Sequence, residues 1–138
     1  MSVVLGYDES PGAARALRIA VEVAAAFDER LVLVFGAAAP GPVGEEYRSH
    51  YEAIRQAGRA GLEQAVTEAD RAGVPTVVEV LDEKPAQALI DAATRHAARV
   101  IVVGSWGESP MRGALLGSTP HKLLHMSTVP VLCVPPEV

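Results

Sequence analysis

The sequence has little cysteine, few aromatic residues and no excess of basic charge. Its single cysteine, Cys133, excludes an internal disulfide. Aromatic residues make up only 4% of the chain, so the core must be built from Ala, Val, Leu and Ile. The net charge of −5 excludes a general electrostatic attraction to nucleic acid or to an anionic membrane surface. An anionic ligand therefore needs a local binding site.

The chain also lacks a long apolar run. No run reaches the about 18 residues of a membrane-spanning helix, and the N-terminus lacks the pattern of a signal peptide. We therefore expect a cytoplasmic protein without a membrane partner. The 138 residues, 49% of them hydrophobic, suffice for one core, so we expect a single domain over residues 1–138.

Apolar runs alternate with amphipathic segments along the chain. The runs predict strands, and the segments, whose apolar residues recur at three- and four-residue spacing, predict helices. Because alternating strands and helices form right-handed βαβ units, we expect an α/β fold with a five-stranded parallel open sheet and helices on both faces. The expected strands run from Ser2 to a stop at Asp8 and over residues 31–35, 74–81, 99–103 and 129–134. The expected helices cover residues 12–27, 47 to a stop at Gly73, 85–97 and 120–125.

A glycine-rich stretch, residues 104–119, lies directly after the fourth expected strand and before the last expected helix. Glycines adopt positive φ readily and let backbone amides approach a ligand, and successive inward amides form an anion cradle. Thr119 followed by Pro120 predicts an N-cap and a first helical position, whose free N–H groups favour phosphate. The stretch is neither a Walker A motif nor Gly-x-Gly-x-x-Gly. From these residues alone, a long turn without a ligand is about as good an interpretation.

The glycine-rich stretch resembles the signature of the universal stress protein family, through Gly104, Gly107, Gly117 and Ser118. Further segments look like the first strand and loop, the second strand and the last strand of that family: residues 3–8 with Ser10 and Pro11, residues 31–35 and residues 129–134. The resemblance covers nearly the whole chain. It implies an adenine nucleotide alpha hydrolase-like fold with strand order 3-2-1-4-5.

The resemblance implies a regulatory protein of the stress response that binds ATP, alone or with Mg²⁺, while AMP and cyclic AMP remain open. The family's aspartate after the first strand meets the adenine and ribose end of the ligand, and Asp8 stands at that position. From the residues alone, Asp8 and Ser118 are also candidates for helix capping. The expected nucleotide contacts are Gly6, Asp8, Phe35, Gly36, Val103, Gly104, Ser105, Gly107, Arg112, Gly117, Ser118 and Thr119.

Two other functions stay open. Trp106, Glu108 and Gly36 depart from the family pattern, which motivates a dimeric interaction protein of the same fold that holds no nucleotide. Family members commonly pair through their last strands, so we expect a homodimer through Val129–Val134. The third function is a feeble ATPase, and because no general base or paired metal carboxylates are evident, we expect no enzyme beyond that.

Other groups of residues give weaker indications of function. His121 and His125 are four residues apart on an expected helix, but without a third ligand they indicate a helix surface and not a metal site. Ser105 and Ser118 have no identifiable base, which argues against nucleophilic hydrolysis. Cys133 lies in an apolar run, where a thiol behaves as a small hydrophobic group. The aromatic stripe beginning at Tyr47 and Tyr51 indicates core or dimer packing.

Overall fold

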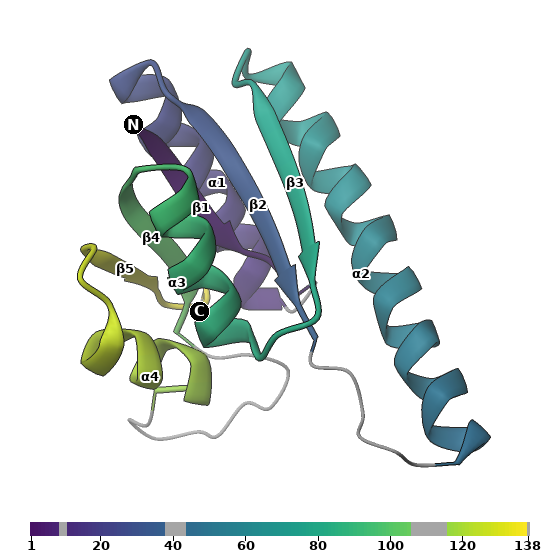
Figure 1. The fold of residues 1–138 in the computed structure, drawn as a ribbon. Helices are drawn as coiled ribbons and strands as arrows, with labels where there is room; N and C mark the ends of the chain where they lie inside the picture. The colour runs from purple at the N-terminus through teal and green to yellow at the C-terminus, as the bar shows by residue number, and fades with distance from the viewer. Residues whose placement is uncertain (9–10, 38–43, 106–115, 138) are drawn as a thin grey trace.

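The computed structural model describes residues 1–8, 11–37, 44–105 and 116–137 of the chain. Strands and helices alternate throughout this part, as the sequence pattern predicted (Figure 1). None of the helices described is long and apolar enough to cross a membrane. In chain order the elements are β1 (Ser2–Gly6), α1 (Pro11–Phe27), β2 (Arg30–Gly36), α2 (Glu45–Arg71), β3 (Thr76–Leu81), α3 (Pro85–Arg95), β4 (Ala98–Gly104), α4 (Ser118–Met126) and β5 (Val131–Val134).

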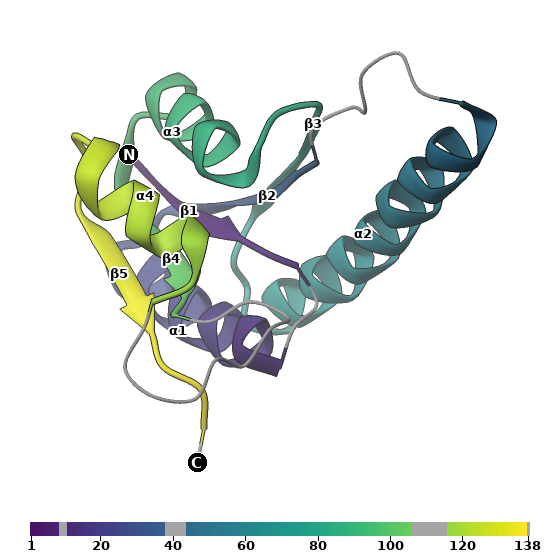
Figure 2. The ribbon, with the colours of Figure 1, turned by 90° about the horizontal axis from the view of Figure 1, so that it is seen from below.

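The strands form one parallel sheet with the order β3-β2-β1-β4-β5. This confirms the expected fold class and strand order. The central strand β1 pairs with β2 on one side and with β4 on the other, so the direction of the chain across the sheet reverses there. Helices α1 and α2 cover one face and α3 and α4 the other (Figure 2). In open sheets of this kind, ligands bind beyond the carboxyl ends of the strands at the reversal point.

Each face of the sheet carries its own apolar core, because successive strand residues point to opposite faces. Val3 and Leu5 pack toward α1 and α2, whereas Val4 between them packs toward α3 and α4. All three side chains are fully buried. Strands covered on both faces must be apolar at every position, which explains the uninterrupted runs in the sequence.

Two strands are shorter than the sequence predicted. Strand β3 begins at Thr76 and not at Val74. Val74 is buried, and its amide donates to the Ala69 carbonyl oxygen of α2, so this amide is used by the end of the helix and not by the sheet. Strand β5 begins at Val131 and not at Val129. Pro130 has no N–H for the ladder, although its carbonyl oxygen still accepts a hydrogen bond from Ile101.

Helix α2 is only half covered by the sheet. Its 27 residues span about 40 Å, twice the about 20 Å of the six-residue strand β3. Leu62, Ala65 and Ala69 are buried in the half that follows Gly58, whereas Ile54 in the preceding half is 41% exposed. The long stripe predicted for this helix is therefore core only in its second half. The first half projects beyond the sheet (Figure 1).

Candidate nucleotide site

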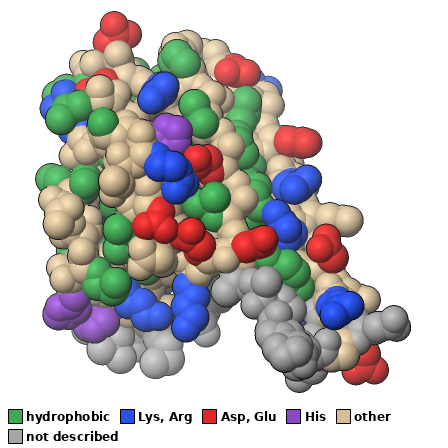
Figure 3. Space-filling model, in the orientation of Figure 1, with side chains coloured by type: hydrophobic (Ala, Val, Ile, Leu, Met, Phe, Trp, Pro, Cys, Tyr) green, Lys and Arg blue, Asp and Glu red, His purple; other side chains and the backbone are tan. Residues whose placement is uncertain are grey.

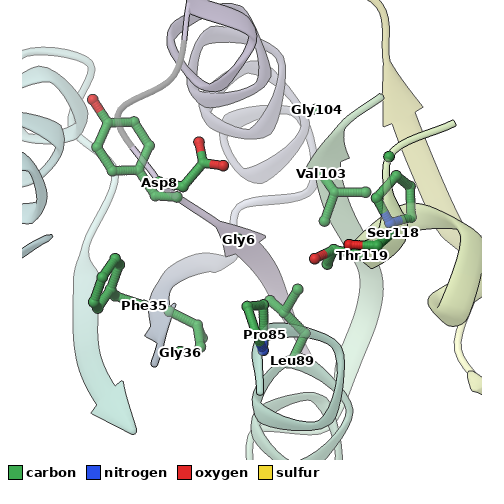
Figure 4. A pocket seen from close by; sticks show the side chains of 14 residues that line it. Gly6, Asp8, Phe35, Gly36, Pro85, Leu89, Val103, Gly104, Ser118 and Thr119 are labelled. Carbon is green, nitrogen blue, oxygen red and sulfur yellow. The ribbon is translucent and has the colours of Figure 1, made fainter. Parts of the chain in front are cut away.

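A hollow opens at the carboxyl ends of β1, β2 and β4, where the chain direction reverses. Its cavity volume is about 130 Å³. Its lining comes from the ends of three strands and the first turns of two helices (Figure 4). The lining residues are Gly6, Tyr7, Asp8, Val34, Phe35, Gly36, Pro85, Leu89, Val103, Gly104, Gly117, Ser118, Thr119 and Pro120.

Nine of the residues expected from the sequence line this hollow: Gly6, Asp8, Phe35, Gly36, Val103, Gly104, Gly117, Ser118 and Thr119. Gly107 and Arg112 lie outside the described residues. Ser105 is buried behind the lining and does not belong to it. The geometry therefore gathers most of the predicted contacts around one space, while their role in binding stays a prediction.

Gly6 forms the floor of the hollow and leaves no room for a side chain. A Cβ there would lie 2.9 Å from Leu89 Cδ1 and 3.3 Å from Val103 Cγ1. Leu89 comes from α3, so that helix is fixed against the end of β1. A ligand entering the hollow meets backbone and these two apolar side chains, a surface suited to the flat face of a base.

The wall at the end of β2 is made of backbone. A Cβ on Gly36 would lie 2.9 Å from Ala88 Cβ and 3.0 Å from Pro85 Cα, so glycine is required for α3 to begin here. The departure of Gly36 from the family pattern thus has a packing reason. The ring of Phe35 packs against Gly58 of α2, which leaves the backbone of Phe35 to line the hollow.

The opposite wall is the N-terminus of α4. Its N-cap is Gly117, with φ −58° and ψ 164°, and its first helical residue is Ser118. The expected N-cap at Thr119 is wrong, because the amide of His121 already closes the first turn onto the Gly117 carbonyl oxygen at 3.1 Å. Pro120 therefore stands in the first turn, where a missing N–H costs no intrahelical bond. The amides of Ser118 and Thr119 belong to that turn, at the positive end of the helix.

Two amides expected to face the ligand are paired within the protein. The amide of Ser105 donates to the Val134 carbonyl oxygen at 2.9 Å, and that of Gly117 donates to the Ser105 carbonyl oxygen at 2.8 Å. The expectation that these two amides form part of an anion cradle is wrong. Their hydrogen bonds instead fix the start of α4 beside the end of β4. Among the described residues, Ser118 and Thr119 offer the first-turn amides at the hollow.

Asp8 lies beside the end of β1, at the rim of the hollow (Figure 4). Helix α1 begins at Pro11, three residues after Asp8. The helix-capping interpretation of Asp8 stays a prediction. Among the described lining residues Asp8 is the one charged side chain, and the α4 terminus is the feature of that lining that favours an anion.

The surface outside the hollow carries charges of both signs. Over α3, acidic and basic side chains lie side by side (Figure 3). Arg95 contacts Glu79 at 2.7 Å, and His96 Nε2 lies 3.2 Å from the same carboxylate. These paired charges produce no uniform field over α3 that would draw an anion to this face.

Five lining residues were missed from the sequence: Tyr7, Val34, Pro85, Leu89 and Pro120. The sequence could have predicted the two residues that come from α3, Pro85 and Leu89. In a βαβ unit each helix begins at the carboxyl edge of the sheet, and Pro85 and Leu89 are one turn apart at such a beginning.

The histidine pair and the cysteine that the sequence analysis set aside show no feature of a metal or catalytic site among the described residues. The rings of His121 and His125 meet edge to face, with centroids 4.8 Å apart, and both residues are exposed. The described residues contain no group of three potential metal ligands. Burial raises the pKa of the Cys133 thiol, which favours its neutral form.

A polar cluster braces the ends of β2 and β3 from outside the hollow. The Tyr51 hydroxyl lies 3.1 Å from the Ala37 carbonyl oxygen and donates a hydrogen bond to the Asp82 carboxylate. That bond to Asp82 raises the pKa of the Tyr51 hydroxyl. Arg55 Nη1 lies 3.5 Å from the same carboxylate. Helix α2 is thereby tied to the segments that follow both strands.

Comparisons with known proteins agree with this fold. The family model described as "Universal stress protein family" matches residues 1–135. A universal stress protein of Thermus aquaticus is 33% identical over 135 residues, which cover 96% of this chain and 97% of the relative.

Solved structures of the same family are similar throughout. A universal stress protein in complex with cAMP has a TM-score of 0.71 and 29% identity, over 97% of this chain and 96% of that one. A universal stress protein from Archaeoglobus fulgidus in complex with dAMP has a TM-score of 0.73 and 23% identity, over 97% of both chains. The hollow at the reversal point, the fold around it and the match along the sequence lead to one conclusion: the chain belongs to the universal stress protein family.

Proposed function

We propose that this protein binds an adenine nucleotide in the hollow and acts as a regulatory protein of the stress response. The observation that carries the proposal is the meeting of two unlike surfaces in one space. The first turn of α4 supplies the amides of Ser118 and Thr119, and the walls at the ends of β1 and β2 are flat, with the apolar side chains of Leu89 and Val103 beside them. A nucleotide has the same two parts, a polyanion and a flat base.

The two surfaces give the ligand an orientation. The phosphates lie toward Gly104 and the first turn of α4, and the base lies toward Gly36. Asp8 at the end of β1 then accepts hydrogen bonds from the ribose. The structures solved with cAMP and with dAMP, of relatives 29% and 23% identical, support an adenosine ligand for this chain too.

ATP is the ligand we propose first, alone or with Mg²⁺, and AMP and cyclic AMP are the alternatives. Calorimetric titration of ligand-free protein with ATP, ADP, AMP and cyclic AMP decides between them. Saturable heat with ATP supports the proposal, and tighter binding of AMP or cyclic AMP would change the nucleotide assigned. No heat with any of them would contradict nucleotide binding.

The second candidate is a dimeric interaction protein of the same fold that holds no nucleotide. The observation that favours it is that the described lining contains one acidic and no basic side chain. A protein of this kind gives no heat in the titration and still forms its dimer. We propose binding and not turnover as the activity, and release of phosphate from ATP at a rate that tracks site occupancy would contradict this.

We also propose a homodimer through the edge strand β5 (Val131–Val134). Strand β5 has a partner strand, β4, on one side only among the described residues. Leu132 on this strand is 38% exposed, and Leu124 and Met126 of the neighbouring α4 are 53% and 55% exposed. An apolar edge strand beside exposed apolar side chains favours pairing with a second copy.

A further inference from the structure

Helix α2 contacts the segments that follow β2 and β3 through its projecting half. The first half of the helix, residues 45–57, lies beyond the sheet and exposes Ile54. Its contacts with the rest of the fold include those of Tyr51 and Arg55 with the segments after β2 and β3. A helical segment that projects beyond the sheet and exposes its side chains opens more readily than the core does.

The Tyr51 hydroxyl joins three segments at one point. It belongs to α2, lies 3.1 Å from the Ala37 carbonyl oxygen after β2, and donates to the Asp82 carboxylate after β3. The guanidinium carbon of Arg55 lies 5.8 Å from the centroid of the Tyr51 ring and adds a contact to the same group. The amide of Ala37 donates to the Leu81 carbonyl oxygen at 3.0 Å, so the ends of the two strands are joined directly.

This unit adjoins the wall of the hollow. Ala37 directly follows Gly36, which lies against Pro85 and Ala88 so tightly that a Cβ would come within 3.0 Å of both. One residue earlier, the Phe35 ring rests on Gly58 at the centre of α2. Gly36, Phe35 and Pro85 all line the hollow. Close-packed contacts of this kind transmit displacement, because they leave no free volume to absorb it.

We infer that Tyr51 is a positioning residue that couples the projecting half of α2 to the base-side wall of the nucleotide hollow. The inference rests on the proposed function, since it assigns an effect to the ligand of that site. A base seated against Gly36 stabilises the wall, the wall fixes Ala37 and Asp82, and these hold Tyr51. Nucleotide occupancy then orders residues 45–57.

Coupling between two sites is reciprocal, so losing the contact must weaken nucleotide binding too. Replacing Tyr51→Phe removes one hydrogen-bonding hydroxyl and keeps the ring. We expect affinity for AMP to fall about fivefold. Amide hydrogen exchange in residues 45–57 slows on adding AMP in the unmodified chain, and this slowing is lost in Tyr51→Phe.

Matched variants separate coupling from mere stabilisation. Asp82→Asn keeps an oxygen that accepts the Tyr51 hydrogen bond and retains the response, whereas Asp82→Leu loses it. A purely structural Tyr51 would make Tyr51→Phe exchange faster by the same factor with and without AMP, with unchanged affinity. That result overturns the inference, as does AMP binding by the unmodified chain without slower exchange in residues 45–57. If the unmodified chain binds neither AMP nor ATP, the proposed function fails, and the inference with it.

Discussion

The amide of Gly117 donates a hydrogen bond to the carbonyl oxygen of Ser105 across 2.8 Å. The two residues are distant in sequence but adjacent at the carboxyl end of β4, and the amide of Ser105 is itself bonded to Val134 at the end of β5. Through this pair the start of α4 is fixed to the sheet. The side of the hollow where we propose that phosphate binds is therefore a helix terminus held in a defined place, as preorganised recognition requires.

Replacing Gly36→Ala should destabilise the protein and weaken nucleotide binding. The added Cβ meets Ala88 Cβ at 2.9 Å and backbone atoms of Pro85 and Glu83 at 3.0 and 3.1 Å, so α3 must shift. We expect a loss of about 1–3 kcal/mol in the free energy of unfolding, as for other overpacked sites. Chemical denaturation measures this loss, and calorimetry measures the affinity.

Gly73→Ala is the matched control for that substitution. Gly73 has φ +73° and open space around it, so alanine there is strained by its backbone alone. A cost of about 1–2 kcal/mol is expected. Because Gly73 lies away from the hollow, nucleotide affinity should not change. Equal losses of affinity in the two variants would show that lower stability, and not the wall, is responsible.

Acid should weaken the contact between Glu29 and Arg99. Arg99 donates from Nε and Nη2 to one oxygen of Glu29, at 2.9 and 2.7 Å, and these hydrogen bonds lower the pKa of Glu29 from its ordinary value of 4.5. A carboxyl group with a lowered pKa in the folded state contributes stability above its unfolded pKa. That contribution is lost as the pH falls from 4.5 through the lower folded pKa.

Glu29→Gln tests this pH dependence. The variant should be less stable than the unmodified chain at neutral pH, and the difference should shrink as the pH falls below 4.5. Urea unfolding at several pH values measures it. A difference that stays constant down to the acid end of the series would contradict an ionic role for Glu29.

Leu132→Lys should convert the proposed dimer into a monomer. Leu132 is 38% exposed on the edge strand β5, so a lysine there fits the monomer but places like charges together across a paired edge. Light scattering coupled to size exclusion gives the mass of each form. Val78→Lys on β3 is the matched control, since Val78 is 44% exposed on the opposite edge of the sheet. If the dimer survives Leu132→Lys and dissociates in Val78→Lys, the interface lies at β3, and the proposed pairing through β5 is contradicted.

The sheet was readable from the sequence because its strands are buried on both faces. Residues 31–35 form an apolar run between charged residues and a glycine, and β2 exceeds that run by one residue at each end. The predicted starts of β3 and β5 were wrong by two residues each. Val74 and Val129 are apolar like strand residues, yet neighbouring hydrogen bonds and Pro130 place them outside the ladder.

The site was readable only in part, because its chemistry depends on contacts between distant segments. The glycine spacing predicted that Gly104 and Gly117 lie together, and both line the hollow. Nothing local indicates that the amide of Ser105 donates to Val134, which is far along the chain. The need for glycine at position 36 likewise depends on where α3 begins. Sequence spacing thus identified the residues around the hollow, and tertiary packing decided which of their groups are free to bind.

The most direct measurement is calorimetric titration of ATP into Ser118→Pro, with Ser118→Ala as control. Proline is favoured at the first helical position, and the extended Gly117, with ψ 164°, suits the residue before it, so α4 keeps its start and loses one amide donor. We expect the affinity for ATP to be lower by a factor of about 10–100 in Ser118→Pro and nearly unchanged in Ser118→Ala. Equal affinity of Ser118→Pro and the unmodified chain would contradict phosphate binding by the α4 terminus.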